Sequence, residues 1–243
     1  MNLTCEQVEK LRKLEDRCEL QPLFKQKALF GEFSAYDISS AMVLLFERSY
    51  VNSMNLIKKK AIEFKLSKNP VVKYLRKTGN LSYMLDDKLM QSVAKTAGAE
   101  PMLCFANSFF MAVGLEKYNI ENVKVVAGLA TAPLIDETDC TYVKHTFTHA
   151  VLQVGDYIYD YNYNIKLKAE QYFEFFAFNI VNEIPSRECL KQFLIMKQAG
   201  LSSKKLGKYN DMIYITLANK DAMKRLYNYN VGSSIVVDNK LVD

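Results

Sequence analysis

The sequence predicts an α+β protein in which helices flank a small antiparallel sheet. Apolar residues recur at helical spacing through residues 1–97, strand-like runs and turn signals occupy the middle of the chain, and helical spacing returns from Glu170 onward. The chain has 243 residues, of which 49% are hydrophobic and 24% are charged. This composition supplies a core for one generous domain, or for a domain with helical additions.

The N-terminal region, residues 1–97, is predicted to be mainly helical. Apolar residues at helical spacing mark a first helix: Leu3, Val8, Leu11 and Leu14. Asp37 or Ser39 could cap a second helix, whose apolar run continues through Phe46. The features expected after it are, in order, a break at Pro70, a turn at Gly79-Asn80 and a short helix from Asp86 to Ala97.

Residues 54–77 form a locally basic segment. Against the single acid Glu63 they hold these basic residues: Lys58, Lys59, Lys60, Lys65, Lys68, Lys73, Arg76 and Lys77. We interpret the segment as a solvated helical face, with a docking surface for an acidic partner as the alternative. The net charge of the chain, +5, is too mild to indicate nucleic acid as a partner.

The middle of the chain is predicted to hold one buried helix followed by three strands. Ala99-Glu100-Pro101 has the form of a helix start, and the helix is expected to run from Met102 to Tyr118. The elements expected after it are a strand at Val123–Ala130, a polar loop at 133–141, and strands at Thr146–Val154 and Tyr157–Tyr163 joined by a turn at Gly155-Asp156.

The C-terminal part is expected to be helical again. Helices are predicted at Glu170–Phe178, at Ser186–Gln198, and from Asp211 or Asp221 to Tyr227. The run MIYITLA at 212–218 could instead form a strand.

The sequence predicts a cytoplasmic protein without a membrane segment. Its first residues are charged and amphipathic and lack the apolar core of a signal peptide. The longest uncharged apolar stretch, Pro101–Leu115, is shorter than the roughly 20 residues that a membrane span needs. The cysteines are odd in number and widely spaced, and they form no CxxC pair, which is typical of reduced thiols. A secreted protein with one free thiol is the alternative.

Two histidines, His145 and His149, limit the search for a catalytic base. Cys104 lies at or near the start of the predicted buried helix, where unpaired N–H groups and the helix dipole stabilise a thiolate. The same amides could help to hold an oxyanion. The alternative is that Cys104 is a buried structural cysteine, since cysteine is among the most buried residue types.

The predicted hairpin places a carboxylate beside one of these histidines. If Gly155-Asp156 is a two-residue turn, Asp160 becomes the diagonal neighbour of His149 on the same face, at about 7 Å between backbones. Asp160 could then accept the ring proton of His149 and fix its tautomer. Asn162, directly opposite His149, could do the same with its amide. We favour Asp160 because a carboxylate also stabilises an imidazolium.

A metal site is the weaker interpretation of these residues. His145 lies on the same face as His149, but four strand residues separate the two by about 13 Å. Cys140 with the two histidines gives a zinc site as a minor alternative. We therefore predict neither a metal ion nor a cofactor.

The order of these elements resembles a known arrangement. The resemblance rests on a helix with CFANSFFMAVGLEKYNI, a strand VKVVAGLAT, a strand with THAVLQV and a strand YIYDYN. With spacings of 149 − 104 = 45 and 160 − 149 = 11 residues, this order resembles the transglutaminase-like branch of the papain-like cysteine protease superfamily. The resemblance covers roughly residues 98–165. It implies a nucleophile helix packed on a small antiparallel sheet, with a helical region 1–97 before it and a helical extension within 98–243, all of which could form one domain.

The resemblance implies a role for each matching residue: Cys104 as nucleophile, His149 as base and Asp160 as the residue that orients the base. It implies no cofactor. The chain departs from the family around the oxyanion hole, because it has no tryptophan and has Gly98 where papain-type enzymes carry glutamine. Gln91 and Asn162 are the alternative candidates for an oxyanion donor.

Such a site performs acyl transfer through a thioester. We expect a thiol hydrolase that acts on amide bonds of a protein or peptide, either as a cysteine peptidase or as a glutamine deamidase. Two alternatives stay open: an amine-accepting acyltransferase of the transglutaminase kind, and a catalytically inactive protein-binding module on the same fold.

Overall fold

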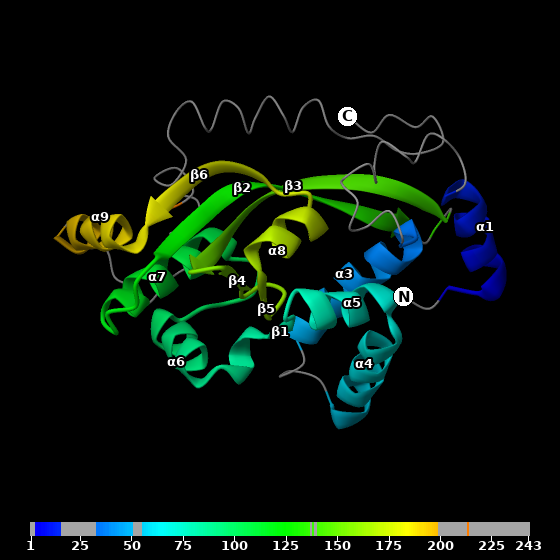
Figure 1. Cartoon of the computed structure of the whole chain (residues 1–243), viewed down its shortest axis with the longest axis horizontal. Coiled ribbons are helices and arrows are strands. Elements are labelled where there is room, and N and C mark those ends of the chain that lie inside the picture. Colours follow the sequence, from blue (N-terminus) through cyan, green and yellow to red (C-terminus); the bar gives the residue numbers. More distant parts are fainter. Residues whose placement is uncertain are drawn as a thin grey trace.

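An antiparallel sheet of six strands, with helices around it, forms the framework of the protein (Figure 1). The computed structural model describes residues 3–15, 33–50, 55–136, 138, 140–198 and 213. Within these residues the mixture of helices with an antiparallel sheet confirms the α+β class that the sequence predicts.

The elements follow one another in the chain as helices, then mostly strands, then helices again. The helices are α1 (Cys5–Glu15), α3 (Ala35–Ser49), α4 (Leu56–Lys68), α5 (Pro70–Thr78), α6 (Lys88–Ala97), α7 (Cys104–Glu116), α8 (Ala169–Phe175) and α9 (Ser186–Gln198), with a 3-10 turn at Met84–Asp86. The strands are β1 (Ser82–Tyr83), β2 (Val123–Asp136), β3 (Thr141–Val154), β4 (Tyr157–Asp160), β5 (Ile165–Lys168) and β6 (Asn179–Pro185). Their order across the sheet is β1-β5-β4-β3-β2-β6.

The long strands β2 and β3 curve across the molecule (Figure 1). Helices α6, α7 and α9 lie toward one end of these strands, and α1, α3, α4 and α5 lie toward the other (Figure 1). The middle of β3 therefore lies between the N-terminal helices and the helix that carries Cys104.

Several helices begin at other residues than the sequence indicated. Ser34, rather than Asp37 or Ser39, caps α3, because its side chain accepts the N–H of Asp37 at 3.1 Å. The predicted break at Pro70 is confirmed: α4 ends at Lys68, and Pro70 starts α5, since the first helical position needs no N–H. The short helix predicted from Asp86 is confirmed as α6, with Asp87 as its cap.

The predicted polar loop at 133–141 is too long, because strands occupy 133–136 and 141 and the described residues 138 and 140 lie in the turn between them. The ladder between β2 and β3 runs without a break from Val123 paired with Val154 to Asp136 paired with Thr141. The hydrogen bonds of the ladder join backbone N–H and C=O groups, which polar and apolar residues share. The polar side chains near this end therefore did not prevent strand formation. Both strands are longer than predicted.

The helix predicted at Glu170–Phe178 ends early, at Phe175, and a strand that was not predicted follows it. This strand, β6, pairs with β2 at the edge of the sheet, and its polar side chains suit an edge. The helix predicted at Ser186–Gln198 is confirmed as α9. The elements predicted at 211–227 and 212–218 lie outside the described residues, apart from the buried Ile213.

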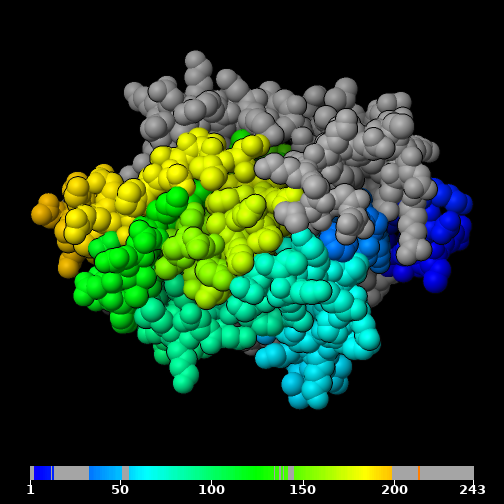
Figure 2. Space-filling model, in the orientation of Figure 1, coloured from blue at the N-terminus to red at the C-terminus, as the bar shows by residue number. Residues whose placement is uncertain are grey.

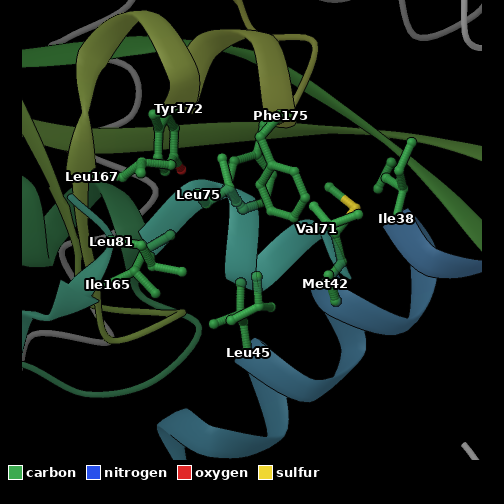
Figure 3. Close-up of a cluster of buried hydrophobic side chains, with 14 of the residues drawn as sticks. Ile38, Met42, Leu45, Val71, Leu75, Leu81, Ile165, Leu167, Tyr172 and Phe175 are labelled. Carbon is green, nitrogen blue, oxygen red and sulfur yellow. The ribbon is translucent and has the colours of Figure 1, made fainter. Parts of the chain in front are cut away.

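Two apolar clusters cover opposite faces of the sheet. In β2, Val126 belongs to one cluster while its neighbours Val125 and Ala127 belong to the other, as alternation along a strand requires. The first cluster joins α3, α5 and α8 to the sheet, and Figure 3 labels ten of its side chains: Ile38, Met42, Leu45, Val71, Leu75, Leu81, Ile165, Leu167, Tyr172 and Phe175. Helices α3 and α5 thus share a core with the strands, so the boundary after residue 97 does not separate two cores.

Gly128 marks a close approach between β2 and β6. A Cβ atom at this position would lie 2.1 Å from the carbonyl oxygen of Asn179, where the pairing register shifts. We expect Gly128→Ala to lower the free energy of unfolding, measured by urea denaturation, by about 3 kcal/mol because the backbones must separate. Gly155→Ala is the control, since its Cβ would meet nothing within 4 Å and only its positive φ of 54° costs about 1 kcal/mol. Equal losses in the two variants would contradict this close approach.

Candidate active site

Cys104 is the first residue of α7, and its side chain is half-buried. The sequence predicted an earlier start near Pro101, which is wrong: the chain makes a turn at Pro101-Met102, and Met102 adopts a positive φ of 70°. This turn brings the thiol to the first turn of a helix, where amide groups have no carbonyl partner within the helix. Such a position attracts negative charge.

His149 and Asp160 form a buried pair across the β3–β4 hairpin. The predicted turn at Gly155-Asp156 is confirmed, with Val154 paired with Tyr157. Nε2 of His149 lies 2.9 Å from Oδ2 of Asp160, and both residues are 2% exposed. The structure therefore brings the predicted histidine and the predicted carboxylate into contact.

The Asp160 carboxylate accepts hydrogen bonds from several sides. Its Oδ2 atom also accepts the hydroxyl of Tyr172 at 2.6 Å, and its Oδ1 atom accepts the backbone N–H of Asn162 at 2.8 Å. Burial and then the charge of Asp160 raise the pKa of Tyr172 well above 10, so this hydroxyl stays a donor. These bonds hold the carboxylate toward His149, and the bond to Asn162 turns the chain, so β4 ends three residues before the predicted Tyr163.

The electrostatic environment of His149 favours its protonated form. Burial opposes the charge and lowers the pKa of His149, whereas the charges of Asp160 and Cys104 and the hydrogen bonds with both side chains raise it. The raising effects prevail and bring this pKa from 6.5 to about 10. Nε2 faces Asp160, so the hydrogen bond with Cys104 falls to Nδ1. The imidazole thus links a carboxylate to a thiol.

Two polar residues of α7 fix the nucleophile helix in place. Asn107 pairs through its side-chain amide with the backbone N–H of Glu100 at 3.1 Å and with its carbonyl at 2.7 Å, which braces the turn before Cys104. Ser108 donates its hydroxyl to the carbonyl oxygen of Ala150 at 3.0 Å, one residue after His149. These contacts set the position of the thiol relative to the imidazole. The sequence showed the signal, since Asn107 and Ser108 interrupt an apolar run, but we did not assign them this role.

Asn162 holds the turn before the nucleophile instead of orienting the histidine. Its Oδ1 atom accepts the backbone N–H of Met102 at 3.2 Å, and its side chain is buried. Because β4 ends at Asp160, Asn162 has left the strand and does not face His149 across the hairpin. Asp160 and Asn162 were the two candidates for orienting His149. The described hydrogen bonds show Asp160 in contact with the His149 ring.

A cavity of about 380 Å³ opens beside Cys104 and His149. It is lined by Met42, Val43, Phe46, Met102, Cys104, Ala132, His145, Phe147, Thr148, His149, Asn162 and Tyr163. Part of its wall comes from α3, which belongs to the N-terminal region. The cavity residues on α3 carry no recognisable motif, so the sequence did not single them out.

The remaining candidates lie elsewhere. Gln91 lies on the exposed side of α6 and does not line the cavity, so the structure does not bring it to the site. Cys140 is buried with Leu11 and Ala35, and among the described residues no three His, Cys, Asp or Glu side chains are grouped as a metal site would need. The zinc alternative therefore finds no support.

The basic segment forms the outer faces of α4 and α5, and α4 protrudes from one edge of the molecule (Figure 2). Glu63 is the one acidic residue of the segment. It pairs with Arg48 and accepts the Tyr83 hydroxyl, so its charge does not neutralise the exposed lysines. A docking surface for an acidic partner stays a prediction. Across the described residues, no helix has the length and apolar character needed to cross a membrane.

Comparisons with known proteins leave the family of the chain unassigned: no protein-family model, no curated protein and no solved structure matches it. The site itself belongs to a definable chemical class, a buried imidazole held between a carboxylate and a half-buried thiol. Its function is therefore inferred from its own residues.

The raised pKa of His149 gives a testable pH dependence. The folded pKa of about 10 exceeds the unfolded value of 6.5, so the stabilisation from this charge is full below pH 6.5 and is lost as the pH rises through 10. We expect NMR of the ring to show His149 still protonated at pH 8. Cys104→Ala and Asp160→Asn should each move its titration to lower pH, because each removes a negative charge. A ring that titrates near 6.5 in all three proteins would contradict the described pair.

Proposed function

We propose that the chain is a thiol hydrolase that cleaves amide bonds of a protein or peptide through Cys104, His149 and Asp160. The observation that carries this proposal is the pair of contacts made by the buried imidazole, to Asp160 through Nε2 and to Cys104 on its other side. The position of Cys104 at the start of α7 and the adjacent cavity support it. We also propose that residues 98–165 form the papain/transglutaminase-like core that they resemble, acting in the cytoplasm.

The proposed reaction begins with the thiolate of Cys104 beside protonated His149. The sulfur attacks the carbonyl carbon of the substrate, a C–S bond forms, and the carbonyl oxygen takes the electron pair. His149 then gives its proton to the leaving amine as the C–N bond breaks, which leaves a thioester on Cys104. Water then gives a proton to His149 and its oxygen bonds to the acyl carbon. The C–S bond breaks, the acid leaves, and the thiolate of Cys104 again lies beside protonated His149.

Asp160 acts in this scheme through the histidine. Its hydrogen bond fixes the ring so that the opposite nitrogen faces the sulfur, and its charge stabilises the imidazolium. Tyr172 and the backbone of Asn162 hold the carboxylate in turn. Asp160 is thus a positioning residue. Tyr172 and the backbone N–H of Asn162 act on Asp160 and do not touch the reacting atoms.

Two donors are available for the oxyanion. One is the backbone N–H of Cys104, in the first turn of α7. The other is the Nδ2 group of Asn162, which lines the cavity and whose Oδ1 atom is already bonded to Met102. With Asn162 the site would have the pair of donors that acyl transfer commonly uses, although it lacks the family's glutamine and tryptophan.

Hydrolysis fits the site better than transfer to an amine. Cys104 is half-buried, so water can reach a thioester formed on it. A transferase must exclude water to favour an amine. Analysis of products with and without a primary amine separates these two activities.

Alkylation by iodoacetamide tests the thiolate directly. We expect Cys104 to react at pH 6 at least about 10 times faster than the other cysteines, because the imidazolium of His149 stabilises its thiolate. His149→Ala should abolish this advantage, whereas the control His145→Ala, at an exposed position of the same strand, should preserve it. The rates are followed by peptide mass spectrometry between pH 4 and 9. If Cys104 reacts like an ordinary thiol in all three proteins, the chain is better explained as a binding module.

The oxyanion role of Asn162 is tested by comparing two reactions. Asn162→Asp keeps the oxygen that accepts the Met102 N–H but loses the Nδ2 donor. We expect acylation of Cys104 by p-nitrophenyl acetate to fall about 100-fold relative to alkylation by iodoacetamide, because only acylation forms an oxyanion. Gln91→Ala, on the exposed side of α6, is the control that should change neither rate. Equal losses in both reactions would show that Asn162 acts on the thiolate and not on the oxyanion.

A further inference from the structure

The cavity beside the thiol has an apolar wall that comes partly from outside the proposed core. Helix α3 contributes Met42, Val43 and Phe46, and the sheet contributes Ala132 and Phe147. Met42 and Ala132 are each 2% exposed, so this wall is anchored in the core and not formed by loose surface side chains. Phe46 contacts Tyr163 edge to face at 5.7 Å between ring centroids, which ties α3 to the segment after Asp160.

Outside the proposed thiolate–imidazolium pair, the described lining of the cavity presents no charged group to a substrate side chain. Among the described residues that line it there is no lysine, arginine, aspartate or glutamate. Its polar lining consists of Cys104, His149 and Asn162, which the proposed chemistry uses, with His145, Thr148 and the Tyr163 hydroxyl. Burial raises the pKa of Tyr163 well above 10, so its hydroxyl is neutral as well. The charges of the proposed Cys104 thiolate and the His149 imidazolium pair with each other and with Asp160, so a charged side chain placed here would lose its water without gaining an unpaired partner of opposite charge.

The position of the thiol decides which half of a substrate enters the cavity. After attack the acyl part of the substrate stays bonded to Cys104, whereas the amine part leaves. A cavity that Cys104 itself lines therefore receives the group next to the acyl carbon. Its volume of about 380 Å³ lies near the lower end for small-molecule sites, which suits one large side chain better than an extended ligand.

We propose that this cavity selects the residue on the acyl side of the cleaved bond and that it takes a large apolar side chain, aromatic or branched aliphatic. The inference rests on the proposed function and adds the substrate class to it. It also assigns α3, in the N-terminal region, a direct part in specificity. Val43 is the residue best placed to alter this selection, since it lines the cavity from α3 and is partly exposed rather than part of the core.

A panel of peptidyl chloromethyl ketones tests the proposal without a known substrate. The reagents have the form acetyl-Ala-Ala-X-CH₂Cl, with X as Phe, Leu, Gly, Asp or Lys. The sulfur of Cys104 forms a C–S bond with the methylene carbon, and the C–Cl bond breaks to release chloride. We expect alkylation with X as Phe or Leu to be at least about 10 times faster than with Gly, Asp or Lys, because only the large apolar groups fill the cavity.

A charge placed in the wall should change this order. In Val43→Asp the rate for X as Lys should rise at least about 10-fold and the rate for Phe should fall, because the new carboxylate pairs with an ammonium group and disfavours an apolar one. Ser40→Asp is the matched control, since it adds the same charge to α3 at a partly exposed position that does not line the cavity. Phe46→Ala is the second variant and should shift the preference toward larger groups. Circular dichroism checks that each variant is folded.

The outcomes separate this inference from the proposed function. In one outcome, Cys104 reacts rapidly with iodoacetamide in a His149-dependent way and yet is alkylated at equal rates by all five chloromethyl ketones. That result would support the proposed hydrolase and overturn the proposal that the cavity selects a large apolar side chain. A preference for Lys or Asp in the unaltered protein overturns it as well. If Cys104 shows no rapid reaction with iodoacetamide, the proposed function and this inference fall together.

Discussion

The hydrogen bond between Nε2 of His149 and Oδ2 of Asp160 depends on water being kept away and on two strands being kept in register. Both partners are 2% exposed, so each would carry a large desolvation cost without the other. Much of the surrounding structure serves these two conditions. Tyr172 of α8 closes over the carboxylate, the β2–β3 ladder holds the strand of the histidine, and Ser108 ties the nucleophile helix to that strand.

The site could be predicted from the sequence where it depends on local geometry. A two-residue turn and the alternation of side chains along strands were sufficient to place Asp160 on the face of His149, and the hairpin register is as predicted. The bounds of α9 followed from its own periodicity. The hairpin register and the bounds of α9 depend only on residues close together in the chain, which explains why the sequence alone could predict them.

Features that depend on distant contacts could not be predicted in this way. Strand β6 has a polar, edge-like sequence and becomes a strand through pairing with β2, whose paired residues lie 50 to 61 positions earlier in the chain. The start of α7 is set by two bonds in which the backbone N–H groups of Glu100 and Met102 donate to the side chains of Asn107 and Asn162, and these override the helix-start signal of Pro101. The contribution of α3 to the cavity is likewise tertiary, since the residues of α3 that line it carry no motif that points to a site.

The turn at Gly155-Asp156 has a consequence for how the chain can change over evolution. Inserting one residue there would move Asp160 to the opposite face of the sheet, and inserting two would carry it a full strand repeat, about 7 Å, from the imidazole. At Gly155 the space is open, so a side chain there would meet only the strain of the positive φ of 54°, about 1 kcal/mol. The chain length between His149 and Asp160 is therefore under stricter selection than the identity of the residues within it. Distant relatives of this protein should be recognisable by that fixed interval even where little of the intervening sequence survives.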